Sequence, residues 1–167
     1  MPSHLYVTKK PKATLWDIIK GHAVELAVVS YSLITGIAVV TVLVRAAGAV
    51  PSATLQAVPG YFLYGIGGFL TLGGVLALGG LLIRRHNVRR ELNIEQSGWI
   101  LLGVAWGIYL YSAVRYMDGA VLQASFALFI GLGCAGRVAA LVGIERQLEA
   151  AVEAVTAPQE GTPDATA

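Results

Sequence analysis

The stretch AVPGYFLYGIGGFLTLGGVLALGGLLI, residues 57–83, contains no charged side chain. About 20 apolar residues in a helix are enough to cross a hydrocarbon core about 30 Å thick. Three other long apolar stretches occur at residues 23–44, 97–114 and 119–143. Only helices and closed barrels satisfy the backbone in lipid, and none of the four stretches alternates polar and apolar residues as a barrel strand does. The sequence therefore predicts an all-α integral membrane four-helix bundle.

The segments outside these four spans are short. Residues 1–13 form a basic N-terminal tail, and the predicted transmembrane domain, 14–156, opens with a capping box that indicates a short interfacial helix. After the fourth span, apolar residues recur at helical spacing over 144–155, which predicts an amphipathic cytoplasmic extension of the last helix. The polar segment 157–167 is interrupted by Gly and Pro, and we expect a disordered tail there.

The cationic residues gather on one side of the alternation that the four spans impose. Nine of them fall on one side and two on the other. The nine are Lys9, Lys10, Lys12, Lys20, Arg84, Arg85, Arg89, Arg90 and Arg146; the two are Arg45 and Arg115. Because cytoplasmic segments carry the excess of Lys and Arg, this bias predicts a multi-pass protein of the cell (cytoplasmic) membrane with both termini cytoplasmic.

The four arginines between the second and third spans form a cytoplasmic basic loop. Its primary role is expected to be orientation of the chain, and binding of anionic lipid headgroups is the alternative. No basic domain accompanies the loop, so nucleic-acid binding is not expected. The expected partner is therefore the lipid bilayer itself.

Two charges lie inside predicted spans. Glu25 is about one turn into the first span, and Arg137 is about six residues from the cytoplasmic end of the fourth. A charge within the bilayer is costly, and a direct ion pair would offset part of that cost. We favour such a structural pair over a transport role. His22 shares a helix face with Glu25, but one His and one carboxylate are too few for a metal site.

Small residues recur at spacings that keep them on one helix face. Residues four or seven positions apart lie close to one face of a helix, and small side chains there let helices approach closely. The candidate packing residues are Gly60, Gly67, Gly74, Gly103, Gly107, Ala135, Ala139 and Gly143. Packing within one chain and assembly into a homo-oligomer are both consistent with this pattern, and we expect both uses.

Signals of enzymatic chemistry are absent from the sequence. It has no P-loop, HExxH, paired-Cys or G-x-S-x-G motif. The glycine pairs of residues 57–83 do not follow a strand, so they do not fit a dinucleotide-binding fingerprint. The single Cys134 excludes an intrachain disulfide. We expect neither catalysis nor a cofactor.

The layout of the chain resembles small four-span membrane proteins of actinobacterial phages and prophages. The shared features are a basic leader ending in Leu15-Trp16-Asp17-Ile18-Ile19-Lys20, the Arg-rich loop, Gly98-Trp99-Ile100-Leu101-Leu102-Gly103 and a charged tail helix. Some of those proteins are regarded as holin-like lysis proteins. The resemblance implies a protein that oligomerises in the cytoplasmic membrane and permeabilises it during phage lysis.

Two other functions remain open. Glu25 in the first of four spans is similar to the first-helix carboxylate of small multidrug-resistance transporters, which implies a small cation or drug transporter. However, Glu25 lies near the membrane edge and Arg137 could neutralise it. A non-catalytic membrane scaffold, with the helix over 144–155 recruiting a partner, is the second alternative.

Overall fold

The computed structural model describes residues 21–45, 58–82, 88–117 and 119–156, and these form four helices without a strand. The helices are α2 (Ala23–Arg45), α4 (Gly60–Leu82), α5 (Val88–Tyr116) and α6 (Val121–Thr156). Each is long and apolar enough to cross a membrane. The prediction of an all-α protein with four membrane-spanning helices is confirmed.

One helix boundary differs clearly from the prediction. The third helix begins at Val88, nine residues before the predicted start of its span at Ser97. Polar residues next to this apolar span continue the helix, because helix formation requires no apolar side chains outside the lipid. The fourth span and residues 144–155 form one continuous helix, α6, as predicted for an extension of the last helix. The interfacial helix, the tail 1–13 and the tail 157–167 lie outside the described residues.

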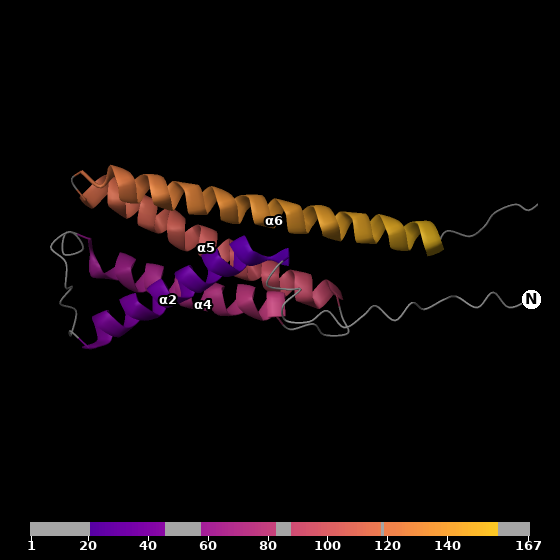
Figure 1. Cartoon of the computed structure of the whole chain (residues 1–167), viewed down its shortest axis with the longest axis horizontal. Coiled ribbons are helices and arrows are strands. Elements are labelled where there is room, and N and C mark those ends of the chain that lie inside the picture. Colours follow the sequence, from indigo (N-terminus) through magenta and orange to yellow (C-terminus); the bar gives the residue numbers. More distant parts are fainter. Residues whose placement is uncertain (1–20, 46–57, 83–87, 118, 157–167) are drawn as a thin grey trace, which may run out of the picture.

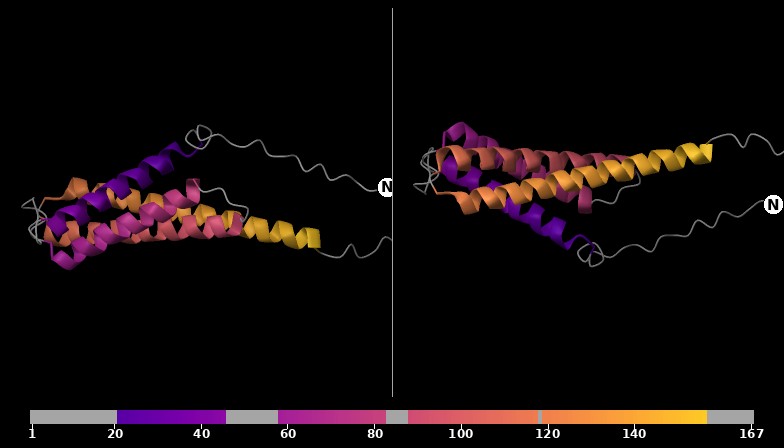
Figure 2. Two further views of the ribbon diagram at one scale, coloured as in Figure 1. Left: turned by 90° about the horizontal axis from the view of Figure 1, so that it is seen from below. Right: turned by 90° about the horizontal axis from the view of Figure 1, so that it is seen from above.

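Successive helices run in opposite directions and pack as a row (Figure 1). Helix α2 packs on α4, α4 on α5, and α5 on α6. No extensive packing joins α2 to α6 within the described ranges. Figure 2 shows α2 running obliquely and diverging from the other helices toward its N-terminal end, while α6 extends beyond the rest of the bundle. The first and last helices therefore flank a lateral opening instead of closing the bundle.

Helix α4 packs on α2 through one series of small residues. A Cβ placed on Gly67 would lie 2.9 Å from Val40 Cγ2, and one on Gly74 would lie 2.9 Å from Leu33 Cβ. From the other side, a Cβ on Gly36 would lie 2.7 Å from the backbone nitrogen of Thr71. Such distances leave no room for a side chain, so the three glycines allow α2 and α4 to make close backbone contact.

A second series of small residues on α4 faces α5. A Cβ on Gly73 would lie 3.0 Å from the carbonyl oxygen of Gly98, and one on Gly80 would lie 2.6 Å from Glu95 Cβ. The closest approach is at Gly98, where a Cβ would collide with the backbone nitrogen of Ala77. The pair Gly73–Gly74 thus supplies one small residue to each of the two neighbours of α4.

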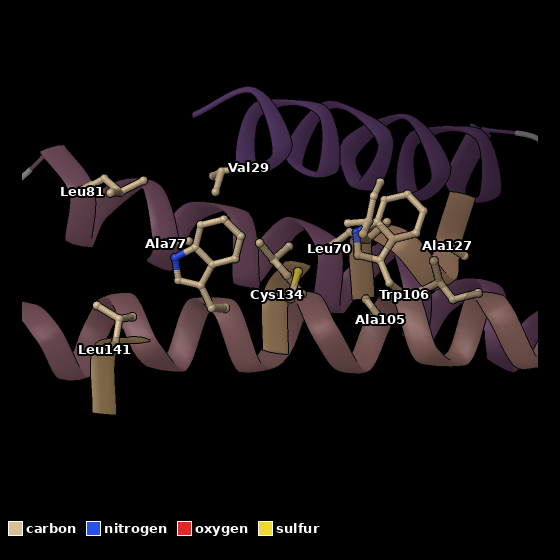
Figure 3. Close-up of a cluster of buried hydrophobic side chains, with 13 residues drawn as sticks. Val29, Leu70, Ala77, Leu81, Ala105, Trp106, Ala127, Cys134 and Leu141 are labelled. Carbon is tan, nitrogen blue, oxygen red and sulfur yellow. The ribbon is translucent and has the colours of Figure 1, made fainter. Parts of the chain in front are cut away.

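The buried apolar side chains form two clusters along the bundle. The larger cluster includes Leu70, Ala77, Leu102, Trp106 and Cys134 (Figure 3). The smaller one lies toward the turn that joins α5 to α6. Its members are Leu43, Val58, Leu63, Ala113, Met117 and Ala120. In that turn Gly119 has a φ of +73°, a conformation that side chains rarely adopt.

Candidate functional site

The Arg137 guanidinium is the centre of a charge network that also contains Glu25 and Glu95. Its Nη1 lies 3.3 Å from Glu25 Oε1. Its Nη2 and Nε donate hydrogen bonds to Glu95 Oε1 at 2.8 and 3.1 Å. These distances place the sequence-predicted partners Glu25 and Arg137 in contact. The network joins α2, α5 and α6, so one cation on the last helix interacts with carboxylates of two others.

Glu95 is a member of the network that was not predicted from the sequence. It falls between the second and third predicted spans, but in the structure it lies within α5 and only 7% of it is exposed. The Trp99 indole Nε1 donates a hydrogen bond to the same Oε1 atom at 3.3 Å. Leu92, Glu95 and Trp99 follow helical spacing that leads into the apolar span, and this pattern was the signal available in the sequence.

His22 lies at the edge of the network. Its Nδ1 is 3.7 Å from Glu25 Oε1, and this buried atom has no hydrogen-bond partner. The side chain is 38% exposed, which fits an interfacial position. Within the described residues, no three His, Cys, Asp or Glu side chains are grouped to hold a metal ion. The network brings together two carboxylates and one guanidinium, so a single cation offsets part of the negative charge that two carboxylates place in the spans.

The predicted basic loop is only partly a loop. Arg84 and Arg85 lie outside the described residues, whereas Arg89 and Arg90 belong to the first turn of α5. Arg90 is exposed. Two of the four arginines are helical because α5 begins at Val88, within the segment that was predicted to be a loop.

The predicted packing residues have different environments. Gly67 and Gly74 face α2, and a Cβ on Gly103 would lie 3.6 Å from Cys134 of α6, an ordinary contact distance. Gly60 and Gly107 are exposed, with nothing within 4 Å of a Cβ. The longest predicted stripe, Gly60–Gly67–Gly74, is therefore an internal seam over two of its three members.

On α6 the predicted small residues point away from the bundle. Ala135 and Ala139 are exposed, and a Cβ on Gly143 would meet nothing within 4 Å. Gly136 and Ala140 are exposed beside them. We call Gly136, Ala139, Ala140 and Gly143 the α6 small-residue face. It lies opposite the side of α6 that buries Cys134 and Leu141 against α5.

Aromatic side chains gather between α2, α5 and α6. The rings of Tyr31 and Trp106 stack with centroids 6.0 Å apart, and Phe126 makes edge contacts with both. The Trp106 indole also donates a 3.1 Å hydrogen bond to the hydroxyl of Ser32, which is fully buried. Trp106 thus bridges α5 to α2 at the middle of the spans.

Comparison with known proteins supplies no family for this chain: no protein-family model, curated protein or solved structure matches it.

Proposed function

We propose that this small multi-pass membrane protein self-associates through the α6 small-residue face and permeabilises the membrane in a holin-like manner. The observation that supports the proposal is the outward position of Gly136, Ala139, Ala140 and Gly143 on a helix that packs mainly on α5 within the described chain. In lipid, small residues favour helix association because they permit close contact that lipid chains do not replace.

Permeabilisation is consistent with the chemistry of the described residues. A lesion formed by lateral assembly needs no catalytic side chain, and the intramembrane charges already bind one another. A transporter that loads a cation on Glu25 would need that cation to compete with Arg137, whose Nη1 lies 3.3 Å from the carboxylate. We therefore favour assembly over solute transport.

Self-association is tested by Ala139→Ile, which places a branched side chain on the α6 small-residue face. We expect crosslinked oligomers in membranes to decrease about tenfold, equivalent to ~1.4 kcal/mol, and expression to no longer depolarise the host cell. Crosslinking and a membrane-potential dye measure the two effects. Ala38→Ile is the matched control, because Ala38 is also an exposed alanine but lies on α2.

Three results would contradict this function. Wild-type protein that stays monomeric in membranes at high expression would remove its physical basis. Oligomers that form normally, without any depolarisation, would support an assembling scaffold instead. Drug resistance that disappears in Glu25→Gln would support the transporter alternative.

The proposed orientation places both termini in the cytoplasm. In intact cells, an impermeant thiol reagent is expected to label a Ser52→Cys variant and to leave an Asn87→Cys variant unlabelled until the membrane is opened. Both variants also carry Cys134→Ser, so that only the introduced thiol reacts. Labelling of Asn87→Cys alone in intact cells would reverse the orientation.

A further inference from the structure

The opening between α2 and α6 contains a pocket of about 600 Å³ to which all four helices contribute. Its lining includes Tyr31 and Thr35 of α2, Leu70 of α4, Trp106 of α5, and Gln123 and Phe126 of α6. We propose that this lateral pocket binds one acyl chain of a membrane phospholipid. The proposal does not depend on self-association or on permeabilisation.

The chemistry of the lining selects an uncharged, apolar ligand. None of the described residues that line the pocket is charged, and most of them are aliphatic or aromatic. Its polar side chains are the neutral groups of Tyr31, Thr35, Tyr109 and Gln123. A charged headgroup would lose hydration there without gaining a counterion, so the headgroup remains outside.

The depth of the pocket matches one leaflet. Along α5 the lining runs from Trp106 near the middle of the helix to Met117 at its end. These 11 residue steps at about 1.5 Å each span about 16 Å, close to half of a hydrocarbon core about 30 Å thick. A chain entering from the leaflet at the Met117 end would therefore terminate at the bilayer centre.

The end of the pocket nearer the bilayer centre is lined by the aromatic side chains of Tyr31, Trp106 and Phe126. Trp106 of α5 stacks on Tyr31 of α2 and donates a hydrogen bond to Ser32 of the same helix. These contacts bridge α5 and α2 near the middle of the spans. Beyond this bridge lies the charge network, with Glu25 six residues before Tyr31 in α2. A ligand confined to one leaflet fits this shape better than one that crosses the membrane.

A pocket of this size is not expected to remain empty in lipid. Its volume lies within the roughly 300–1,000 Å³ typical of small-molecule sites. Side chains that face a void lose dispersion contacts. Lipid chains are the apolar molecules that surround the spans in a membrane, and they can enter sideways because α2 and α6 do not pack extensively on each other.

The test uses the full-length protein in phosphatidylcholine vesicles that contain a phosphatidylcholine with a photoreactive group in one acyl chain. Leu70 and Ile66 line the pocket but are only 1% and 3% exposed, so labelling there reports a chain inside. Phe129 is 79% exposed on α6 and reports bulk lipid. We expect both kinds of site to be labelled, as identified by mass spectrometry.

A substitution that fills the pocket distinguishes labelling by a bound acyl chain from labelling by lipid that touches the protein surface. Thr35→Phe is expected to reduce labelling of Leu70 and Ile66 at least fivefold and to leave labelling of Phe129 unchanged. Ile34→Phe is the matched control, because Ile34 is 68% exposed on the adjacent position of α2 and does not line the pocket. Gln123→Phe fills the mouth from α6 and gives the same expected result if Thr35→Phe does not fold.

Three outcomes would overturn the proposal. Labelling of Phe129 without Leu70 or Ile66 would show that no acyl chain enters the pocket. Crosslinks from a photoreactive group at position 35 to a second copy would show that a neighbouring protein fills it. Equal labelling in Thr35→Phe, Gln123→Phe and Ile34→Phe would show that the labelled chains lie elsewhere.

Discussion

Replacing Arg137 by Gln is expected to cause the largest loss of stability among changes to the charge network. The variant leaves Glu95 as a carboxylate that is only 7% exposed and removes the ion pair of Glu25 as well. Breaking a buried pair by removing one partner typically costs about 3–5 kcal/mol. We expect a lower thermal midpoint and a much smaller monodisperse fraction on size-exclusion chromatography in detergent.

The matched control is Arg146→Gln, which removes an exposed arginine from the same helix and should change stability little. Adding Glu95→Gln to Arg137→Gln should recover part of the loss, because it removes the stranded carboxylate. Arg137→Lys should give an intermediate loss, since an ammonium lacks the planar fork that meets both carboxylates. Equal stability of Arg137→Gln and Arg146→Gln would show that the network contributes nothing.

Gly98→Ala is expected to disrupt the α4–α5 interface although it adds only one methyl group. That methyl would collide with the backbone nitrogen of Ala77 and lie 2.7 Å from its Cα. A backbone cannot turn aside as a flexible side chain can, so the two helices must separate along the seam. Overpacking costs about 1–3 kcal/mol and sometimes more, and folded yield is expected to fall severely.

Gly107→Ala provides the matched control on the same helix. A Cβ there meets nothing within 4 Å, and alanine favours helix formation by about 1 kcal/mol over glycine. We therefore expect its folded yield and thermal midpoint to equal or exceed those of the wild type. If Gly98→Ala has the same folded yield and thermal midpoint as Gly107→Ala, α4 and α5 do not approach as closely as described.

The number and type of the helices could be predicted from the sequence because lipid imposes one simple requirement. A charge-free stretch such as residues 57–83, which lacks the alternation of a barrel strand, can satisfy its backbone in the bilayer only as a helix. Helix ends outside the lipid are not fixed in this way. The start of α5 at Val88 was therefore missed, and with it the inclusion of Arg89, Arg90 and Glu95 in that helix.

Only part of the candidate site could be predicted from the sequence, for a related reason. Glu25 and Arg137 are conspicuous because they interrupt apolar spans, and their similar depth suggested an interaction. Glu95 sits beside polar residues, so nothing in composition distinguishes it from a solvated side chain; its burial depends on Gly80, whose missing side chain makes room for it. Spacing likewise identified Gly67 and Gly74 as packing residues but could not specify α2 as the neighbour.

The order in which the chain is synthesised gives the charge network a further consequence. Glu25 and Glu95 both precede Arg137, which follows Glu95 by 42 residues. At about 5–20 residues per second, translation supplies the arginine roughly 2–8 s after the second acid. Until α6 inserts, the carboxylates of Glu25 and Glu95 lack the cation that pairs with them in the structure. A nascent chain that stops after α5 therefore carries two unpaired acids at the membrane. Insertion of the last helix is thus the step at which the acidic residues of the first and third helices gain their shared counterion.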